Sequence, residues 1–205
     1  MEQTVMKERG QIEEVDSDFT TNMPMGLRLD LACGERKALG FVGVDESQLV
    51  GVDQVVNLSN YPWPWDDNSV IEIRCSHYIE HVVDIKSFME QAWRVMRNNG
   101  LITFVAPYYA SIGATQDFTH VRSISEYTFS YFSQKGLADM KLSHYNVNAD
   151  FDVTSIKFVY DGEWETRAVE AIEYARKHYW NVVKEIIVEM KCVKPGRFPV
   201  VESNS

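Results

Sequence analysis

The pattern of apolar and polar residues predicts a chain built mainly from short β-strands with a few helices between them. Residues 27–31 alternate Leu with Arg and Asp, and residues 70–75 are rich in β-branched side chains, and both patterns are typical of strands. Gly, Pro, Asn and Asp between such segments favour turns. The expected strands are residues 27–31, 41–44, 51–58, 70–75 and 101–105, a segment within 141–160 that is clearest over 154–160, and residues 182–193.

Three other segments repeat apolar residues every three or four positions, which predicts amphipathic helices. The clearest is residues 84–97, with Asp84 as the expected N-cap and the sequence Asn-Asn-Gly at 98–100 as the expected stop. Residues 125–137 and 161–179 are the other two. Residues 182–193 alternate like a half-buried strand, although one continuous helix over residues 161–191 also fits their pattern. We favour the strand.

Composition narrows the class of protein. The 205 residues fit one domain with a full core, and 45% hydrophobic with 24% charged residues is ordinary for a soluble globular protein. A net charge of −10 argues against a nucleic-acid-binding surface, which needs clustered Lys and Arg. The three cysteines, Cys33, Cys75 and Cys192, lie far apart without a C-x-x-C pair, so we expect reduced thiols in a cytoplasmic protein.

Domain boundaries follow from the two ends of the chain. Residues 1–24 carry six acidic residues and few apolar ones, which predicts a flexible acidic arm. The alternative is a flap over a ligand site that uses Phe19 and Met23. Residues 25–194 form the expected domain, and the polar, proline-containing residues 195–205 a loose tail. No apolar run approaches the roughly 18 residues of a membrane span, and the start lacks a signal-peptide core, so we expect no membrane contact.

Small residues and a carboxylate follow the first two predicted strands. Residues 32–34, Ala-Cys-Gly, come after the first strand, and Asp45 closes the second. Ligands of open α/β sheets bind beyond the carboxyl ends of the strands, and small residues let a ligand approach the backbone closely. Asp45 is then placed to accept hydrogen bonds from a ribose diol. The sequence therefore predicts a nucleoside-sized cleft at this edge of the sheet.

Two ligands fit such a cleft, a dinucleotide and S-adenosylmethionine. The dinucleotide pattern G-x-G-x-x-G retains only Gly34, because Ala32 and Lys37 stand at its first and last glycines. The short connection between Cys33 and Val42 also leaves no room for the helix whose N-terminus would hold a pyrophosphate. S-adenosylmethionine carries no phosphate, so the missing helix favours it.

This stretch and three later motifs follow one another in a fixed order and share one resemblance. Residues 29–34 with Asp45 resemble motifs I and II of the class I S-adenosylmethionine-dependent methyltransferases. Residues 76–81 resemble their Ser-His-x-x-Glu-His turn, residues 94–100 their Arg-Val-Leu-x-x-Gly-Gly helix end, and residues 117–122 the Asp-Pro-Thr-His-x-Arg segment of some members. Within the class, the chain resembles the small type-11-like group in which the first helix is reduced to a loop.

The resemblance implies a fold, a reaction and a cofactor. The fold is α/β, with a Rossmann-like, seven-stranded, mostly parallel sheet and an antiparallel C-terminal strand. The reaction moves a methyl group from S-adenosylmethionine to an oxygen or nitrogen of a small molecule or sugar. The expected partner is that acceptor, with no nucleic acid and no metal ion, and homodimer formation is left open.

The resemblance also implies the site residues. Asp30 and the backbone of residues 32–34 would hold the methionine end of the cofactor, Asp45 its ribose, and Asn57 with Leu58 its adenine. His77 is the expected base, because a histidine at the end of the fourth strand can take a proton from the acceptor. The predicted cofactor-binding set is Asp30, Ala32, Cys33, Gly34, Lys37, Asp45, Asn57, Leu58, Ser76 and His77, and the predicted catalytic set is His77, Asp117 and His120.

Plainer interpretations stay open beside these assignments. Asn57 can simply end its strand, Asp117 can merely hold His120 or Arg122, and Phe118 stands where the family segment has proline. Ala32 in place of a motif I glycine is also compatible with a non-catalytic protein that keeps the fold and binds the cofactor. A nicotinamide-dependent oxidoreductase is a third class, which the lost glycines disfavour.

Overall fold

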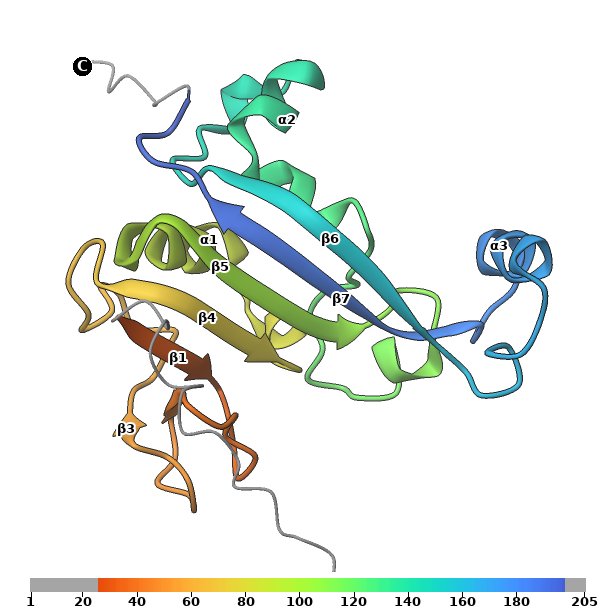
Figure 1. Ribbon diagram of the computed structural model, residues 1–205, viewed down its shortest axis with the longest axis horizontal. Helices are drawn as coiled ribbons and strands as arrows, with labels where there is room; N and C mark the ends of the chain where they lie inside the picture. Colours follow the sequence, from red (N-terminus) through yellow and green to blue (C-terminus); the bar gives the residue numbers. More distant parts are fainter. Residues whose placement is uncertain (1–25, 198–205) are drawn as a thin grey trace, which may run out of the picture.

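The computed structural model describes residues 26–197, in which seven strands form one sheet (Figure 1). The strand order is β3-β2-β1-β4-β5-β7-β6, with β7 antiparallel to both of its neighbours and the remaining pairs parallel. This confirms the predicted sheet and its antiparallel last strand. The strands are β1 (Leu27–Leu31), β2 (Val42–Asp45), β3 (Gln54–Val55), β4 (Val70–Ser76), β5 (Met96–Pro107), β6 (Phe151–Tyr160) and β7 (Val183–Cys192).

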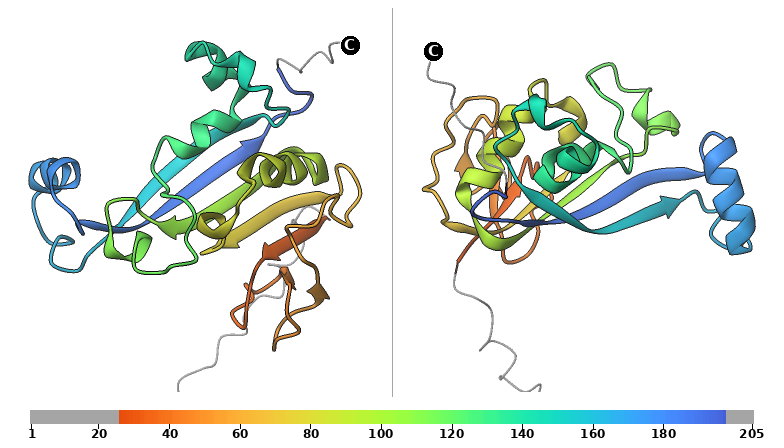
Figure 2. Two further views of the ribbon diagram at one scale, coloured as in Figure 1. Left: turned by 180° about the vertical axis from the view of Figure 1, so that it is seen from behind. Right: turned by 90° about the horizontal axis from the view of Figure 1, so that it is seen from above.

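Helices α1 and α2 cover the same face of the sheet (Figure 2). The α-helices are α1 (Ile85–Val95), α2 (Gln134–Asp139) and α3 (Val169–His178), and the short 3₁₀ helices are η2 (Ile79–His81), η3 (Ile112–Ala114), η4 (Thr128–Phe132) and η5 (Ser143–Tyr145). None of the helices within residues 26–197 has the length and apolar composition needed to cross a bilayer. The predicted acidic arm, residues 1–24, lies outside the described residues.

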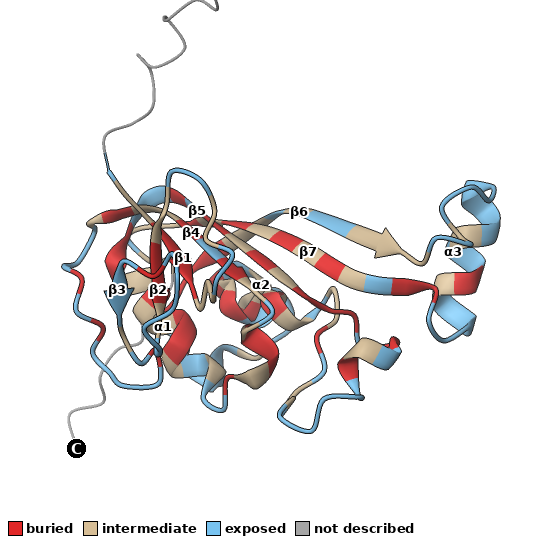
Figure 3. Ribbon diagram, turned by 90° about the horizontal axis from the view of Figure 1, so that it is seen from below, coloured by how far each residue is buried: buried red, intermediate tan, exposed pale blue. Residues whose placement is uncertain are grey.

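The core lies between the sheet and these helices. Alternate residues of the central strands, such as Ile73, Phe104 and Val188, are fully or almost fully buried and pack against Phe88 of α1 and Phe129 of η4. Their neighbours along each strand are more exposed and mostly polar, as expected for a sheet with one solvated face (Figure 3). The opposite face carries Arg28, Glu72, Arg74, Thr103, Glu189 and Lys191, which strand register places side by side.

Strands β6 and β7 extend beyond the others as a two-stranded arm with α3 at its end (Figures 1 and 2). Arg176 of α3 ties this helix to the domain, since its Nη1 lies 2.9 Å from Glu126 Oε1 and its guanidinium lies over the Phe158 ring at 4.5 Å. Strand β7 pairs with both β5 and β6, so residues 183–192 form the strand that their alternation predicts. The alternative of one helix over residues 161–191 is therefore wrong.

Several predicted boundaries differ from the structure. The helix expected over 84–97 keeps its predicted cap, because Asp84 accepts a hydrogen bond from Ser87 N, but it ends at Val95. The Asn-Asn-Gly signal lies inside β5, where Asn99 has φ +64° and the pairing with β4 shifts register. The Asn-Asn-Gly residues therefore form an irregularity within strand β5 and do not end the helix.

Two other predicted helices are shorter than expected. Residues 125–137 divide into η4 and α2, because Ser133 adopts an extended backbone and caps α2 by accepting a hydrogen bond from Gly136 N. The helix expected over 161–179 begins only at Val169. The third strand, expected over 51–58, is reduced to the two residues of β3.

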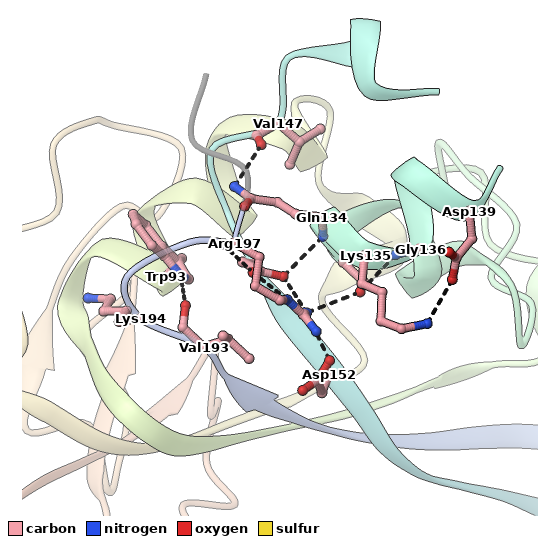
Figure 4. Close-up of polar contacts among 12 residues, drawn as sticks. Trp93, Gln134, Lys135, Gly136, Asp139, Val147, Asp152, Val193, Lys194 and Arg197 are labelled. Atoms are coloured by element: carbon pink, nitrogen blue, oxygen red, sulfur yellow. Dashed lines mark hydrogen bonds and ion pairs between the residues drawn. The ribbon is translucent and has the colours of Figure 1, made fainter. Parts of the chain in front are cut away.

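The chain contacts the domain beyond the predicted boundary at residue 194. Arg197 binds the fully buried carboxylate of Asp150 through its Nε and Nη2, at 2.8 and 2.6 Å, and lies beside Gln134 and Asp152 (Figure 4). Residues 198–205 lie outside the described part of the chain.

Candidate functional site

The turn after β1 is held in an unusual backbone conformation by β2. Ala32 and Gly34 both have positive φ, +53° and +52°, a region that a side chain disfavours. Cys33 N donates to Val44 O, and Gly34 N donates to Asp45 Oδ2, each at 3.0 Å. The predicted turn and the predicted carboxylate are therefore joined by a hydrogen bond. Asp45 both fixes the conformation of the turn and places its carboxylate beside it.

Asp30, the residue before Leu31 at the end of β1, is hydrogen-bonded to the connection that follows the same turn. Its side chain is 3% exposed, and its Oδ2 accepts a hydrogen bond of 2.7 Å from Ala38 N. Burial raises the pKa of Asp30, while the hydrogen bond from Ala38 and the charge of Arg74 oppose that rise. The buried carboxylate thus braces the short connection that replaces a first helix.

Three cavities meet around this edge of the sheet. The first, of about 670 Å³, is lined by the turn, Arg74, Ser76, His77 and Glu185. The second, of about 130 Å³, joins it at Ala32 and is lined by Asp45, Glu46, Val56, Leu58 and Tyr78. The third, of about 530 Å³, shares His77 and Glu185 with the first and also includes Asp117 and His120. A ligand in the first two cavities would therefore end beside a ligand in the third.

His77 stands at the junction of the first and third cavities. Its φ is +53°, and its backbone N donates to Val105 O at 2.8 Å, which fixes the turn after β4. The imidazole is 47% exposed, with Nε2 at 3.2 Å from Glu185 Oε1 and Nδ1 at 3.6 Å from Glu80 Oε1. Contact with Glu80 raises the pKa of His77, partial burial opposes this, and Glu185 adds to the rise.

Asp117 and His120 lie on a loop that hydrogen bonds hold against η2 and the residues after it. Val121 N donates to Glu80 O at 3.0 Å, and Arg122 Nη2 donates to Val82 O at 2.6 Å. His120 is 9% exposed, with Nε2 at 3.9 Å from Asp117 Oδ2. The structure therefore brings all three predicted catalytic residues to one cavity and gives Arg122 a role in holding the loop.

Some predicted residues have other partners. Lys37 Nζ lies 2.9 Å from Asp53 Oδ2 and is absent from the lining of the three cavities. The side-chain oxygen of Asn57 accepts a hydrogen bond of 2.8 Å from Ser59 N, as in the plainer interpretation of a strand-ending Asn, whereas Leu58 lines the second cavity.

Tyr108, the residue after β5, lies in the core and lines none of the three cavities. It is 2% exposed, and its hydroxyl donates to Glu126 Oε2 at 2.9 Å. Arg74, Tyr78 and Glu185 are three of the lining residues that sequence reasoning missed. Arg74 and Tyr78 flank the predicted Ser-His turn and so carried a local signal, but Glu185 comes from β7 and carried none.

Solved structures resemble the chain over most of its length. An S-adenosylmethionine-dependent methyltransferase from Archaeoglobus fulgidus has a TM-score of 0.54 at 16% identity, over 82% of this chain and 86% of that one. A possible histamine N-methyltransferase from Thermotoga maritima has a TM-score of 0.50 at 18% identity, over 84% of each chain. The chain has the class I methyltransferase fold.

A third structure with this fold carries the cofactor of its class. Geranyl diphosphate methyltransferase, solved in complex with S-adenosylmethionine, has a TM-score of 0.51 at 13% identity, over 82% of this chain and 79% of that one. A scan against protein-family models and a search of curated protein sequences find no match.

Proposed function

We propose that this protein is an S-adenosylmethionine-dependent methyltransferase that acts on an oxygen or nitrogen of a polar small molecule or sugar. The observation that supports this best is the continuity of the three cavities, with Ala32 joining the first two and His77 joining the first to the third. This order matches an adenosyl group, a methionine chain and an acceptor laid end to end. The methyltransferase fold of the chain agrees with it.

The lining of the first and second cavities fits the chemistry of the cofactor. The second cavity offers Leu58, Val56 and the Tyr78 ring to an adenine and the Asp45 carboxylate to a ribose diol. The first cavity offers charges of both signs, with Asp30 for an ammonium group and Arg74 for a carboxylate. An α-amino acid carries both groups, so this donor set suits the methionine end.

The chemistry asked of the protein is modest. S-adenosylmethionine, when bound, supplies a methyl group on a positively charged sulfur, which becomes a neutral thioether once the acceptor atom has taken the methyl. The protein must align the acceptor and receive the proton that the acceptor loses. His77 is placed for that proton at the junction of the cavities. Glu185, 3.2 Å from its Nε2, stabilises the imidazolium that results.

The third cavity indicates the class of acceptor. Its lining includes Gln116, Asp117, Asp161, Asn181 and Lys184, so donors and acceptors of hydrogen bonds surround the space. A molecule with several hydroxyl or amino groups can satisfy them, whereas an apolar one would leave them unpaired. We therefore propose a hydroxylated or aminated small molecule.

Calorimetry with S-adenosylmethionine tests the cofactor site. The full-length protein should bind it, and Asp45→Asn should lower the affinity at least tenfold, because the amide offers one acceptor atom instead of two. Lys37→Met is the matched control and should change the affinity less than twofold, since Lys37 is paired with Asp53. Absence of binding by the unaltered protein contradicts the proposal.

Turnover is tested separately with methyl-labelled S-adenosylmethionine and a panel of sugars, alcohols and amines. His77→Asn is the informative variant, because Asn tolerates the positive φ of this position. We expect unchanged cofactor affinity and a loss of about 10²–10⁴ in turnover, the usual contribution of a general base. Cofactor binding without methyl transfer to any acceptor would support the non-catalytic alternative.

A further inference from the structure

Glu80 is a buried carboxylate without a hydrogen-bond partner among the described residues. Its side chain is 2% exposed, and neither Oε1 nor Oε2 accepts a hydrogen bond. The nearest cationic group, His77 Nδ1, lies 3.6 Å from Oε1, which is too long for a hydrogen bond. Among the described residues, this buried carboxylate has only a half-exposed imidazole as a near charge and accepts no hydrogen bond, which indicates a place for a further cationic partner.

His81 lies beside Glu80, and its hydrogen bonds leave Nε2 with a free lone pair. Its Nδ1 lies 2.9 Å from Thr119 Oγ1, and Thr119 Oγ1 in turn donates to Asp117 Oδ1 at 2.6 Å. Since the hydroxyl proton is given to the carboxylate, the Thr119 oxygen can only accept from the histidine. His81 therefore carries its proton on Nδ1, and Nε2 is a potential metal ligand.

His120 is held in the same tautomer by a different partner. Its Nδ1 lies 3.2 Å from Ala114 O, and a carbonyl oxygen can only accept a hydrogen bond. The proton is again on Nδ1, so Nε2 is left as the ligand. The rings of His81 and His120 pack edge to face, with 4.7 Å between their centroids.

From this arrangement we infer a site for a divalent transition-metal cation, with Glu80, His81 and His120 as its protein ligands. One ligand atom from each residue lies within 4.8 Å of the other two. Ligand atoms bind zinc at about 2.0–2.2 Å, so the three side chains need to close by about an ångström around the ion. The sequence alone predicted no metal ion here.

The chemistry of the ligands selects the kind of ion. Two imidazoles and one carboxylate suit zinc, iron or manganese, whereas magnesium and calcium prefer oxygen ligands alone. All three residues line the 530 Å³ cavity, so the remaining coordination positions face the acceptor space. Three protein ligands with open positions are typical of catalytic metal sites.

The role of the ion, unlike its binding, rests on the proposed function. A hydroxyl of the acceptor held by the cation would be more acidic. As its oxygen formed the bond to the methyl carbon, the bond from that carbon to the sulfonium sulfur would break and the hydroxyl proton would pass to His77. This favours an acceptor whose hydroxyl can reach the metal, such as a sugar or another polyol.

The test is titration of the metal-stripped, full-length protein with Zn²⁺ and, separately, with Mn²⁺, in the absence of S-adenosylmethionine. We expect one equivalent bound per chain with at least one of these ions, and a rise in Tm on binding. Glu80→Gln and His120→Ala should each weaken binding more than tenfold. Thr119→Val should weaken it about 10- to 100-fold, the usual effect of losing a group that orients a ligand, and Thr119→Ser should restore it.

Exposed histidines elsewhere serve as controls for adventitious binding. His144→Ala and His178→Ala should leave the affinity and the stoichiometry unchanged, because both residues are exposed and absent from the cluster. Failure of the folded protein to bind either ion, or equal binding by Glu80→Gln, overturns the inference. Metal binding by a protein that binds no S-adenosylmethionine would refute the proposed function and leave the metal site standing.

Discussion

Replacing Arg197 with Ala should destabilise the protein, although Arg197 lies near the end of the chain. The Asp150 carboxylate is fully buried and accepts three hydrogen bonds from Arg197, from the backbone N at 3.0 Å, Nε at 2.8 Å and Nη2 at 2.6 Å. Gln134 N supplies a fourth at 3.0 Å. Arg197→Ala keeps the two backbone donors and removes the guanidinium, which leaves a buried charge without its counterion.

The magnitude follows from the burial of the two partners. Removing one partner of a buried ion pair costs about 3–5 kcal/mol. The Arg197 side chain is 28% exposed, so water already weakens the pair, and we discount the loss to about 2–4 kcal/mol. The second contact, between Arg197 and the half-exposed Asp152, adds less than about 1 kcal/mol.

Urea unfolding of the full-length protein, followed by circular dichroism, measures this loss. Arg167→Ala is the matched control, because Arg167 is exposed and its side chain lies over the Trp164 ring and donates to the Glu163 carbonyl, and it should cost less than about 1 kcal/mol. A loss below about 1 kcal/mol for Arg197→Ala would show that the segment is as loose as the sequence alone suggested.

The same pair predicts an acid dependence. Burial raises the pKa of Asp150, but the hydrogen bonds from Arg197 and Gln134 outweigh burial and leave the pKa lowered. Its contribution to stability is therefore complete above the unfolded pKa of about 3.9 and is lost as the pH falls toward the lower folded value. Asp150→Asn should remove this part of the acid dependence, and an unchanged profile below pH 4 would contradict the assignment.

Three further variants test other features of the fold by urea unfolding. Ala32→Gly should raise the free energy of unfolding by about 0.5–1 kcal/mol, because glycine relieves the positive φ and costs some entropy in return; a loss would argue against strain at this turn. Asp84→Ala should cost about 1 kcal/mol through loss of the α1 cap, with Lys86→Ala as the neutral comparison. Phe88→Ala should cost about 3–5 kcal/mol by opening a cavity against Trp63 and Phe104, and a cost under 1 kcal/mol would mean that this side chain is not in the core.

The strands and the turn after β1 could be predicted because their signals are local. Leu29 and Leu31 alternate with Arg28 and Asp30, and both leucines are fully buried in the packed sheet, although Asp30 is buried as well because it accepts a hydrogen bond from Ala38 N. Helix ends were harder to predict, since they depend on which of several polar residues acts as a cap. Ser133 caps α2 although Ser125 offered the same chemistry earlier in the chain.

The candidate site was predictable only where it is built from one segment. His77 follows a strand and could be found from its motif, whereas Glu185 reaches it from β7, more than a hundred residues later. Likewise, Glu80 and His81 are neighbours in sequence, but His120 joins them only because the 117–122 loop folds back on η2. Residues that come together only through tertiary contacts have no characteristic spacing in the sequence, so a single sequence does not reveal the cluster.

The polar face of the sheet has a consequence for engineering. Arg28 and Glu72 pair at 2.6 Å across β1 and β4, and Arg74 and Glu189 continue the charged row. Within residues 26–197 no helix covers this side of the sheet, and its charges tolerate contact with water. Grafting such a layer from a larger relative would bury these charges together, and every one would need replacement at once. Inserted domains are better attached at the solvent-exposed turns between strands, where the hybrid keeps both surfaces of the host intact.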